Sequence, residues 1–114
     1  MENCVFCKII EGKIGSKKLY EDKDMIIIND IAPKAKYHYL MIPKDHYPLL
    51  ENLDDEKGMK LLRCLRKIKE LKTLLHLESG YRIVINQGED AGQTVHHLHI
   101  HILAGQKLPW EDAK

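Results

Sequence analysis

The chain has 114 residues, of which 44% are hydrophobic and 31% charged, the composition of one ordinary folded domain. Its 18 Lys and Arg residues nearly balance its 17 Asp and Glu residues, and the net charge of +1 argues against nucleic acid or an anionic membrane as a partner. Apolar runs such as residues 25–28 are far shorter than the roughly 20 residues that span a bilayer, and no secretory signal is visible. We therefore expect a single domain over residues 1–114, located in the cytoplasm.

The first third of the chain is expected to form one short helix and three strands. The helix covers about Phe6–Glu11 and is stopped by Gly12. Two strands, Leu19–Glu21 and Met25–Asn29, flank a turn at residues 22–24. Tyr39–Ile42 is a further strand that ends at Pro43, because proline cannot donate to a sheet ladder.

A long amphipathic helix follows. Asp54 or Asp55 can cap its start, and Gly80 lies just past its end. Apolar residues recur at spacings of three and four and share one face: Leu61, Leu65, Ile68, Leu71 and Leu75. Basic residues form the solvated remainder: Lys60, Arg63, Arg66, Lys67, Lys69 and Lys72.

The last third of the chain is expected to return to strands. Tyr81–Asn86 is one strand, Gln87–Thr94 is a polar loop, and Val95–Leu103 is the final strand. The order of strands, helix and strands predicts an α+β fold with a largely antiparallel sheet. Because one long helix covers only one face, the other face requires a dimer partner or a ligand site.

Four of the seven histidines fall within residues 96–101. Side chains alternate across a strand, so three of these histidines share one face: His97, His99 and His101. Leu98, Ile100 and Ile102 share the opposite face, which can pack against the long helix. Three neighbouring imidazoles can supply a nucleophile, a proton donor and an orienting group, or they can bind zinc. The spacing alone leaves both interpretations open.

Three cysteines without a signal peptide do not make a disulfide framework. Cys4 and Cys7 form a C-x-x-C pair, which leaves redox or metal chemistry open, although no thioredoxin-like βαβ pattern surrounds it. Cys64 lies among leucines and is expected to be a small core residue. Residues 86–94 contain two glycines, and the backbone N–H groups of such a loop can cradle phosphate oxygens.

Four segments of the chain together resemble the histidine triad (HIT) superfamily. His97–Leu103 resembles its motif His-φ-His-φ-His-φ-φ, in which φ is apolar. Gly92–Thr94 is similar to the Gly-Gln-Ser/Thr element of the histidine triad nucleotide-binding, protein kinase C inhibitor-like branch. Residues 30–33, His38 and residues 42–44 match the central segment, and residues 4–10 match the opening, so the similarity covers nearly the whole chain.

This resemblance implies a HIT-like fold, an antiparallel sheet with one long and one short helix, assembled as a homodimer. It implies a hydrolase that cleaves purine nucleoside 5′-phosphoramidates at the α-phosphate, of the adenosine 5′-monophosphoramidase type, without a catalytic metal. His99 corresponds to the nucleophile that forms a nucleotidyl-histidine, His101 hydrogen-bonds the phosphate, and His97 sets the proton positions. His38 corresponds to the fourth histidine, behind the triad.

The same resemblance implies the contacts to a purine nucleoside monophosphate. Asn86 and Thr94 contact the 5′-phosphate region, and Gly92 and Gln93 shape the loop. Asp30 accepts from the ribose hydroxyls, a role that suits the two acceptor oxygens of a carboxylate. The base slot is lined by Val5, Phe6, Asn29 and Ile31.

Related proteins also carry a structural zinc on a cysteine pair and two histidines, which correspond here to Cys4, Cys7, His46 and His97. Two thiolates and two imidazoles suit a closed structural zinc site. The alternative without a metal is a pair of reduced cysteines and a surface histidine.

Two other functions stay open at this point: a dinucleoside polyphosphate hydrolase, or a nucleotide- or zinc-binding interaction protein with incidental turnover. His96 stands where the dinucleoside polyphosphate branch has glutamine, which disfavours that branch. Trp110 stands in a tail without the Trp-Pro-Pro-Gly-like ending of eukaryotic members, so the leaving-group preference is not fixed.

Overall fold

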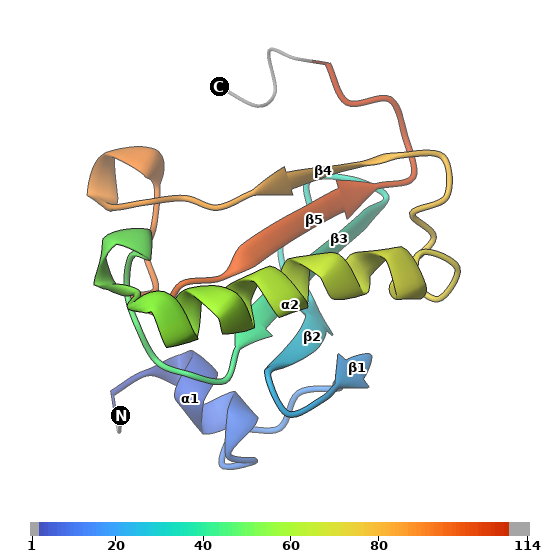
Figure 1. Ribbon diagram of the computed structural model, residues 1–114. Coiled ribbons are helices and arrows are strands. Elements are labelled where there is room, and N and C mark those ends of the chain that lie inside the picture. Colours follow the sequence, from blue (N-terminus) through green and yellow to red (C-terminus); the bar gives the residue numbers. More distant parts are fainter. Residues whose placement is uncertain (1–2, 110–114) are drawn as a thin grey trace.

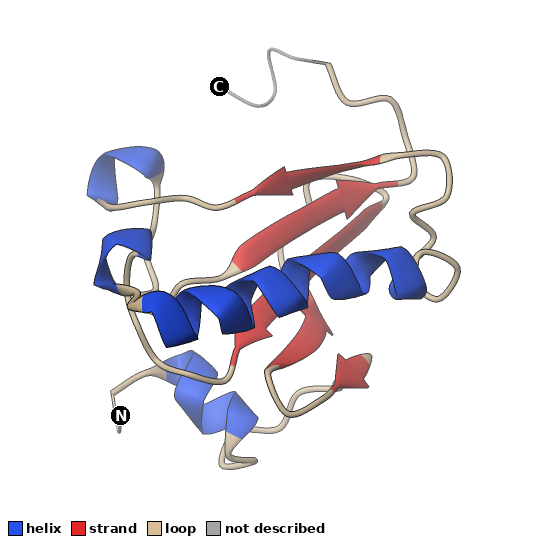
Figure 2. Ribbon diagram, viewed as in Figure 1, coloured by secondary structure: helices blue, strands red, loops and turns tan. Residues whose placement is uncertain are grey.

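The computed structural model describes residues 3–109, which form one antiparallel sheet with a helix on each face (Figures 1 and 2). The strands lie in the order β1-β2-β3-β5-β4. The elements are α1 (Val5–Ile10), β1 (Tyr20–Glu21), β2 (Met25–Asn29), β3 (Tyr37–Pro43), α2 (Asp55–Leu71), β4 (Tyr81–Val84) and β5 (Ile100–Ala104). Short 3-10 turns cover Leu50–Asn52 and Glu89–Ala91. The predicted α+β fold with one long and one short helix is confirmed.

The sheet is buried on both faces along its central strands. In β2, Met25 and Ile27 join the core beneath α2, whereas Ile26 and Ile28 pack toward α1. This is why β2 is a continuous apolar run instead of an alternating one. Among the described residues, no helix is long and apolar enough to cross a membrane.

Helix α2 begins where the sequence predicts and ends earlier. Asp54 is the N-cap, and its side chain accepts a hydrogen bond of 2.8 Å from the amide of Lys57. The helix ends at Leu71, well before Gly80, and the chain turns through His76, whose φ is +59°. The turn buries both Leu75 and Leu77, which a continuing helix could not do because positions two apart face different directions.

The final strand is shorter than predicted: β5 begins at Ile100, and residues 95–99 lie outside it. The register pairs Ile100 with Met41, so Leu98 would oppose Pro43, which has no N–H to donate. The amide of Leu98 instead donates to the carbonyl of Tyr47 at 2.8 Å. The predicted alternation survives nonetheless, because Leu98, Ile100 and Ile102 all enter the core under α2.

The remaining boundaries shift by one or two residues. β3 extends over Tyr37–Pro43, longer than the predicted strand, and β4 ends at Val84, two residues short of Asn86. The pairing of β4 with β5 stops at Val84 and His101. Residues 85–99 are thereby free to form the loop and the turn that carry the site.

Candidate functional site

The three histidines of the motif face the α1 side of the sheet but have different partners. His97 is fully buried, and its Nε2 lies 2.7 Å from the carbonyl oxygen of Pro43. A carbonyl only accepts, so Nε2 carries the proton and Nδ1 keeps its lone pair. That lone pair faces two cysteines and a second histidine.

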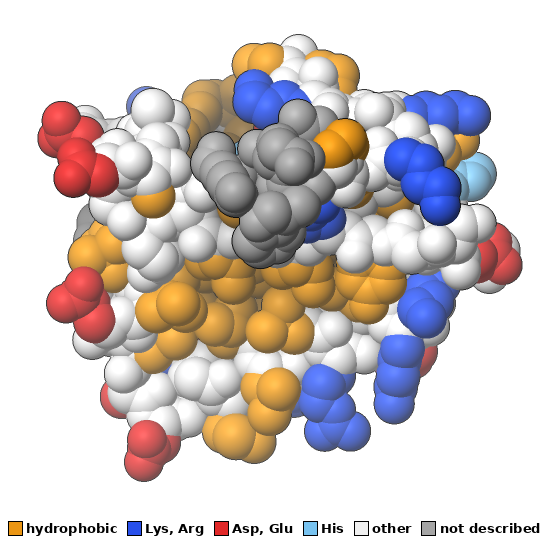
Figure 3. All heavy atoms as spheres, turned by 90° about the horizontal axis from the view of Figure 1, so that it is seen from above, with side chains coloured by type: hydrophobic (Ala, Val, Ile, Leu, Met, Phe, Trp, Pro, Cys, Tyr) orange, Lys and Arg blue, Asp and Glu red, His pale blue; other side chains and the backbone are white. Residues whose placement is uncertain are grey.

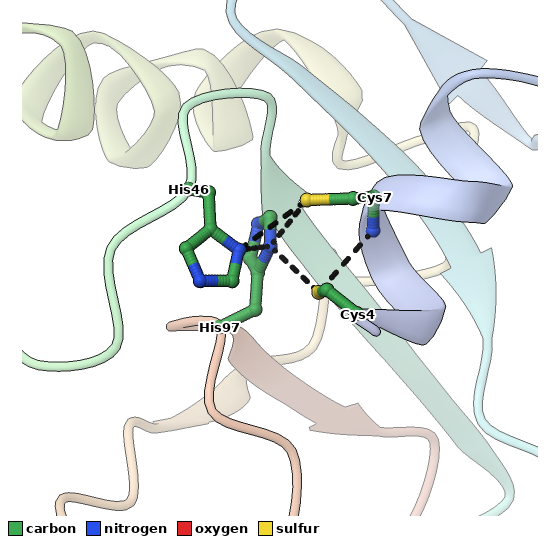
Figure 4. Close-up of side chains that lie close together, drawn as sticks. All are labelled: Cys4, Cys7, His46 and His97. Atoms are coloured by element: carbon green, nitrogen blue, oxygen red, sulfur yellow. Dashed lines mark hydrogen bonds between the residues drawn. The ribbon is translucent and has the colours of Figure 1, made fainter. Parts of the chain in front are cut away.

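Cys4, Cys7, His46 and His97 converge as one group, with their ligand atoms all within 4.8 Å of one another (Figure 4). The Nδ1 atoms of His46 and His97 are 3.1 Å apart, and the nitrogen–sulfur contacts measure 3.3, 3.4 and 3.6 Å. Tetrahedral zinc with its usual bond lengths requires about 3.3 Å between two nitrogens and about 3.6 Å between nitrogen and sulfur. The donor set and its spacing therefore fit zinc, as the resemblance predicts.

Burial disfavours the charged forms of three members of this group, Cys7, His46 and His97. Burial, with the neighbouring Cys4, raises the pKa of Cys7 to about 11. It lowers the pKa of His97 to about 4 and also lowers the pKa of His46. Neutral imidazole nitrogens are ready ligands, whereas the thiol must lose its proton to bind, so metal affinity rises with pH.

His99 has the opposite proton arrangement to His97. Its Nδ1 lies 2.8 Å from the backbone carbonyl of His97, so Nδ1 is the protonated nitrogen and Nε2 holds the lone pair. The ring of Phe6 packs edge-on against the His99 ring, with centroids 5.0 Å apart. In its neutral form His99 therefore presents the lone pair of Nε2 in a fixed orientation, which is what a nucleophile requires.

His38 and His101 form a directed pair beside His99. The amide of Lys34 donates to Nδ1 of His38 at 3.0 Å, which places the His38 proton on Nε2. That Nε2 donates to Nδ1 of His101 at 2.9 Å, so the proton of neutral His101 lies on its own Nε2. Burial, with the nearby His99 and His38, lowers the pKa of His101 to about 4, and burial also lowers the pKa of His38.

Asp30, His38 and His101 are a second set of potential metal ligands, with Asp30 Oδ2 at 3.3 Å from His38 Nε2. A metal would need a lone pair on His38 Nε2. The Lys34 amide donates to the other ring nitrogen, Nδ1, so the proton of neutral His38 lies on Nε2 and leaves no lone pair there. The group is therefore better suited to moving or fixing protons than to binding a cation. The three histidines of the motif do not form a common metal site among the described residues, because the group containing His97 includes neither His99 nor His101.

A cavity of about 500 Å³ opens on this face of the sheet. Four of its lining residues are ones that the sequence predicts for the site: Asp30, His38, Asn86 and His101. His99 does not line it, but its ring centroid is 5.1 Å from that of His101. The cavity also includes two cations, Lys34 and Arg82, that sequence analysis missed. No motif marks them, and Lys34 contacts the His38 side chain through its main-chain amide, which any residue other than proline offers.

The other predicted nucleotide contacts are dispersed. Val5 and Thr94 line a second cavity of about 450 Å³ beside Cys4 and His46. Phe6 is buried against the histidines, whereas Ile31 is fully exposed. Asn29, at the end of β2, is exposed as well. Of the four predicted base-slot residues, only Val5 lines either of these two cavities.

Gln93 and Gly92 shape the loop between β4 and β5. Buried Gln93 accepts from the amide of Gly88 at 2.7 Å and donates to the carbonyl of Pro48 at 2.8 Å. Gly92 has a φ of +85°, which disfavours any residue with a side chain. His96 is exposed, and Trp110 lies outside the described residues.

Comparison with known proteins identifies the family. The HIT domain matches residues 11–108, so the chain belongs to the HIT domain family. Protein HitA of Neisseria gonorrhoeae is 40% identical over 103 residues, covering 90% of this chain and 96% of HitA. The chain is therefore related to HitA. It is also similar to HIT family hydrolases of known structure.

Two solved structures share the fold. The HIT family hydrolase from Legionella pneumophila Philadelphia 1 has a TM-score of 0.89 at 38% identity, over 96% of this chain and 99% of its own. A zinc-bound histidine triad family protein from Mycobacterium smegmatis has a TM-score of 0.77 at 34% identity, over 96% of this chain and 81% of its own.

Proposed function

We propose that this protein is a nucleotide-binding hydrolase that cleaves purine nucleoside 5′-phosphoramidates, of the adenosine 5′-monophosphoramidase type, at the α-phosphate. The observation that carries the proposal is the 2.8 Å contact between His99 Nδ1 and the His97 carbonyl, because it leaves a free lone pair on Nε2. Membership of the HIT family supports it, since the solved HIT relative from Legionella pneumophila is a hydrolase and one from Candida albicans is a histidine triad nucleotide-binding protein.

The reaction then proceeds as two displacements. Nε2 of His99 attacks the α-phosphorus in line with the phosphorus–nitrogen bond, which breaks as the amine leaves with the electron pair and takes up a proton. Water next attacks the nucleotidyl-histidine and releases the nucleoside monophosphate. Dividing one difficult displacement into two lowers the barrier of each step.

The neighbours of His99 have distinct roles in this proposal. His101 donates its Nε2 proton to a phosphate oxygen, and His38 holds His101 in the tautomer that can donate. Asp30 accepts from the ribose hydroxyls, while one of its oxygens also accepts from the Ala32 amide at 2.8 Å. Asn86 and the loop at residues 92–94 bind the 5′-phosphate region.

We further propose that Cys4, Cys7, His46 and His97 hold a structural zinc ion. The spacing of the four donors and the zinc-bound relative from Mycobacterium smegmatis support this. When bound, zinc ties the N-terminal turn to the segment before β5. Because His97 belongs to this group and its carbonyl fixes His99, the zinc site also stabilises the position of the nucleophile.

A homodimer is the assembly that we propose. Within residues 3–109, β4 is an edge strand that pairs only with β5. Tyr81 and Ile83 of β4, and Leu62 and Leu74, on and just after α2, are exposed. Hydrophobic side chains gather on the face seen from above in Figure 3. An unpaired edge beside an apolar surface favours strand-to-strand association. Sedimentation of wild type and Ile83→Lys should give a dimer and a monomer.

The test of the activity is release of amine from an adenosine 5′-phosphoramidate in the presence of a chelator. We expect turnover by wild type, about a 1000-fold or greater loss in His99→Ala, and near-normal turnover in the matched control His96→Ala. Equal turnover by wild type and His99→Ala would refute the nucleophile assignment. If wild type itself is inactive although it binds AMP, the phosphoramidase proposal is wrong.

A further inference from the structure

The C-x-x-C turn has a feature that its role as a ligand pair does not use. Cys4 is the N-cap of α1, and its Sγ accepts from the amide of Cys7 at 3.4 Å. Both sulfurs face Nδ1 of His97, at 3.4 and 3.6 Å, and lie within 4.8 Å of each other. Two cysteines with this spacing and convergent sulfurs can close a disulfide after a small rotation of the side chains.

One cysteine of the pair, Cys4, borders a cavity that small solutes can enter, although only 9% of its surface is exposed. Cys4 lines the cavity of about 450 Å³, together with His46 and Thr94. Cys64, the third cysteine, lies on the buried face of α2 with 1% of its surface exposed, and burial raises the pKa of its thiol to about 12. An incoming oxidant therefore meets Cys4 and not Cys64. Cys64 thus serves as an internal control, because a site-specific oxidant should leave it unmodified.

A change in the C-x-x-C turn is transmitted to the nucleophile by two contacts. Phe6 lies between the two cysteines in sequence, and its ring centroid is 5.0 Å from that of His99 and 5.9 Å from that of His97. The carbonyl of His97 holds Nδ1 of His99. A bond between the sulfurs turns both away from His97 and shifts Phe6, so both supports of His99 are altered.

We propose that Cys4 and Cys7 are a reversible thiol-oxidation site that controls the position of His99, with a low-molecular-weight disulfide as the oxidant. The effect on turnover rests on the function proposed above, whereas formation of the disulfide does not. A metal held by the four residues is lost on oxidation, because the new bond removes both thiolates and leaves two imidazoles.

The reaction balances as two thiol–disulfide exchanges. The sulfur of Cys4 attacks one sulfur of the oxidant, forms a mixed disulfide and releases one thiolate. The sulfur of Cys7 then attacks Cys4 Sγ and releases the second thiolate. The two cysteines give up two electrons to the oxidant, and their two protons pass to the released thiolates.

The test uses glutathione disulfide on the full-length protein, both zinc-loaded and metal-free. Peptide mass mapping is expected to find a Cys4–Cys7 disulfide, a chromophoric chelator is expected to detect one zinc released per disulfide, and dithiothreitol should reverse both. In ring-selective NMR spectra, the His99 and Phe6 resonances should shift. Turnover should fall about tenfold or more, as a displaced reacting group predicts, with the loss mainly in kcat.

Variants separate this site from a general effect of oxidation. Cys64→Ser should respond like wild type, whereas Cys7→Ser should stop at the mixed disulfide on Cys4. Oxidation of Cys64 first, a mixed disulfide that persists on Cys4 in wild type, or ring resonances unchanged after closure would each overturn the proposal. If reduced wild type lacks turnover but closes the disulfide and shifts the His99 resonances, the proposed function fails and the oxidation site stands.

Discussion

Replacing His101 with glutamine should remove one component of the acid sensitivity of this fold. Burial and two neighbouring histidines lower the pKa of His101 to about 4, and its side chain is only 18% exposed. In the unfolded chain the same imidazole titrates near its ordinary value of 6.5. As the pH falls below that value, the unfolded state takes up a proton that the folded state refuses, so folding loses stability.

The magnitude follows from the two pKa values. Each pH unit between about 6.5 and 4 costs up to 1.4 kcal/mol for one group, and the integrated loss from pH 7 to pH 4.5 is about 2 kcal/mol. The contribution is fully present above pH 6.5 and is lost as the pH falls toward 4. Glutamine does not titrate, so the variant should lack this component of the pH dependence.

The assay is urea unfolding followed by circular dichroism, at pH values from 7 to 4.5, with chelator present throughout. Under these conditions no metal contributes, so the difference between the slopes of wild type and His101→Gln reports His101 together with its coupling to His38 and His99. Leu103→Ala, in the same cavity, is the matched control: it should lower the free energy of unfolding by a similar amount at every pH. Parallel pH dependences for wild type and His101→Gln would refute the reasoning.

Three further predictions concern backbone and metal. Gly105→Ala should lower the free energy of unfolding in urea by about 2 kcal/mol more than Gly12→Ala. Both glycines have positive φ, but of the two only Gly105 would place its new Cβ against a ring, 2.5 Å from an atom of Tyr37. Equal costs would contradict the clash. Asp54→Ala should cost about 1 kcal/mol through the lost cap, and an unchanged midpoint would contradict that role. Zinc at 100 times its Kd should add about 2.7 kcal/mol to the free energy of unfolding, and a chelator should abolish this effect. If neither zinc nor the chelator changes Tm, a structural zinc is excluded.

The sequence predicted the elements well where periodicity and packing agree. The apolar spacing in residues 61–71 and the cap at Asp54 both match α2. The predicted end of the helix was wrong because it was placed by Gly80. The chain turns instead at His76, which adopts a left-handed conformation although it carries a side chain. Local preference cannot reveal a turn that tertiary burial of Leu75 and Leu77 favours.

The last strand shows a second limit. The alternation of histidines with Leu98, Ile100 and Ile102 predicted correctly which side chains enter the core, but it could not show that Pro43 lies opposite Leu98. Pairing between distant segments decides where a ladder stops, and a single sequence does not contain that register.

For the site, the sequence predicted which side chains take part, but not which main-chain groups fix the tautomers of the histidines. The C-x-x-C pair and the histidine motif could be identified from spacing. The carbonyls of Pro43 and His97 and the amide of Lys34 have no signature, because every residue offers a similar main chain. These groups determine which nitrogen of each histidine keeps a lone pair.

The group of cysteines and histidines also has a consequence for the order of folding. Cys4 and His97 are separated by 93 residues, so their contact closes one of the longest loops that this chain can make. During synthesis, Cys4 and Cys7 have no His97 to contact until about 90 further residues have been made. Contacts of such long range form late, after the sheet has brought the segments together. Capture of a metal would then mark a finished protein rather than initiate its folding.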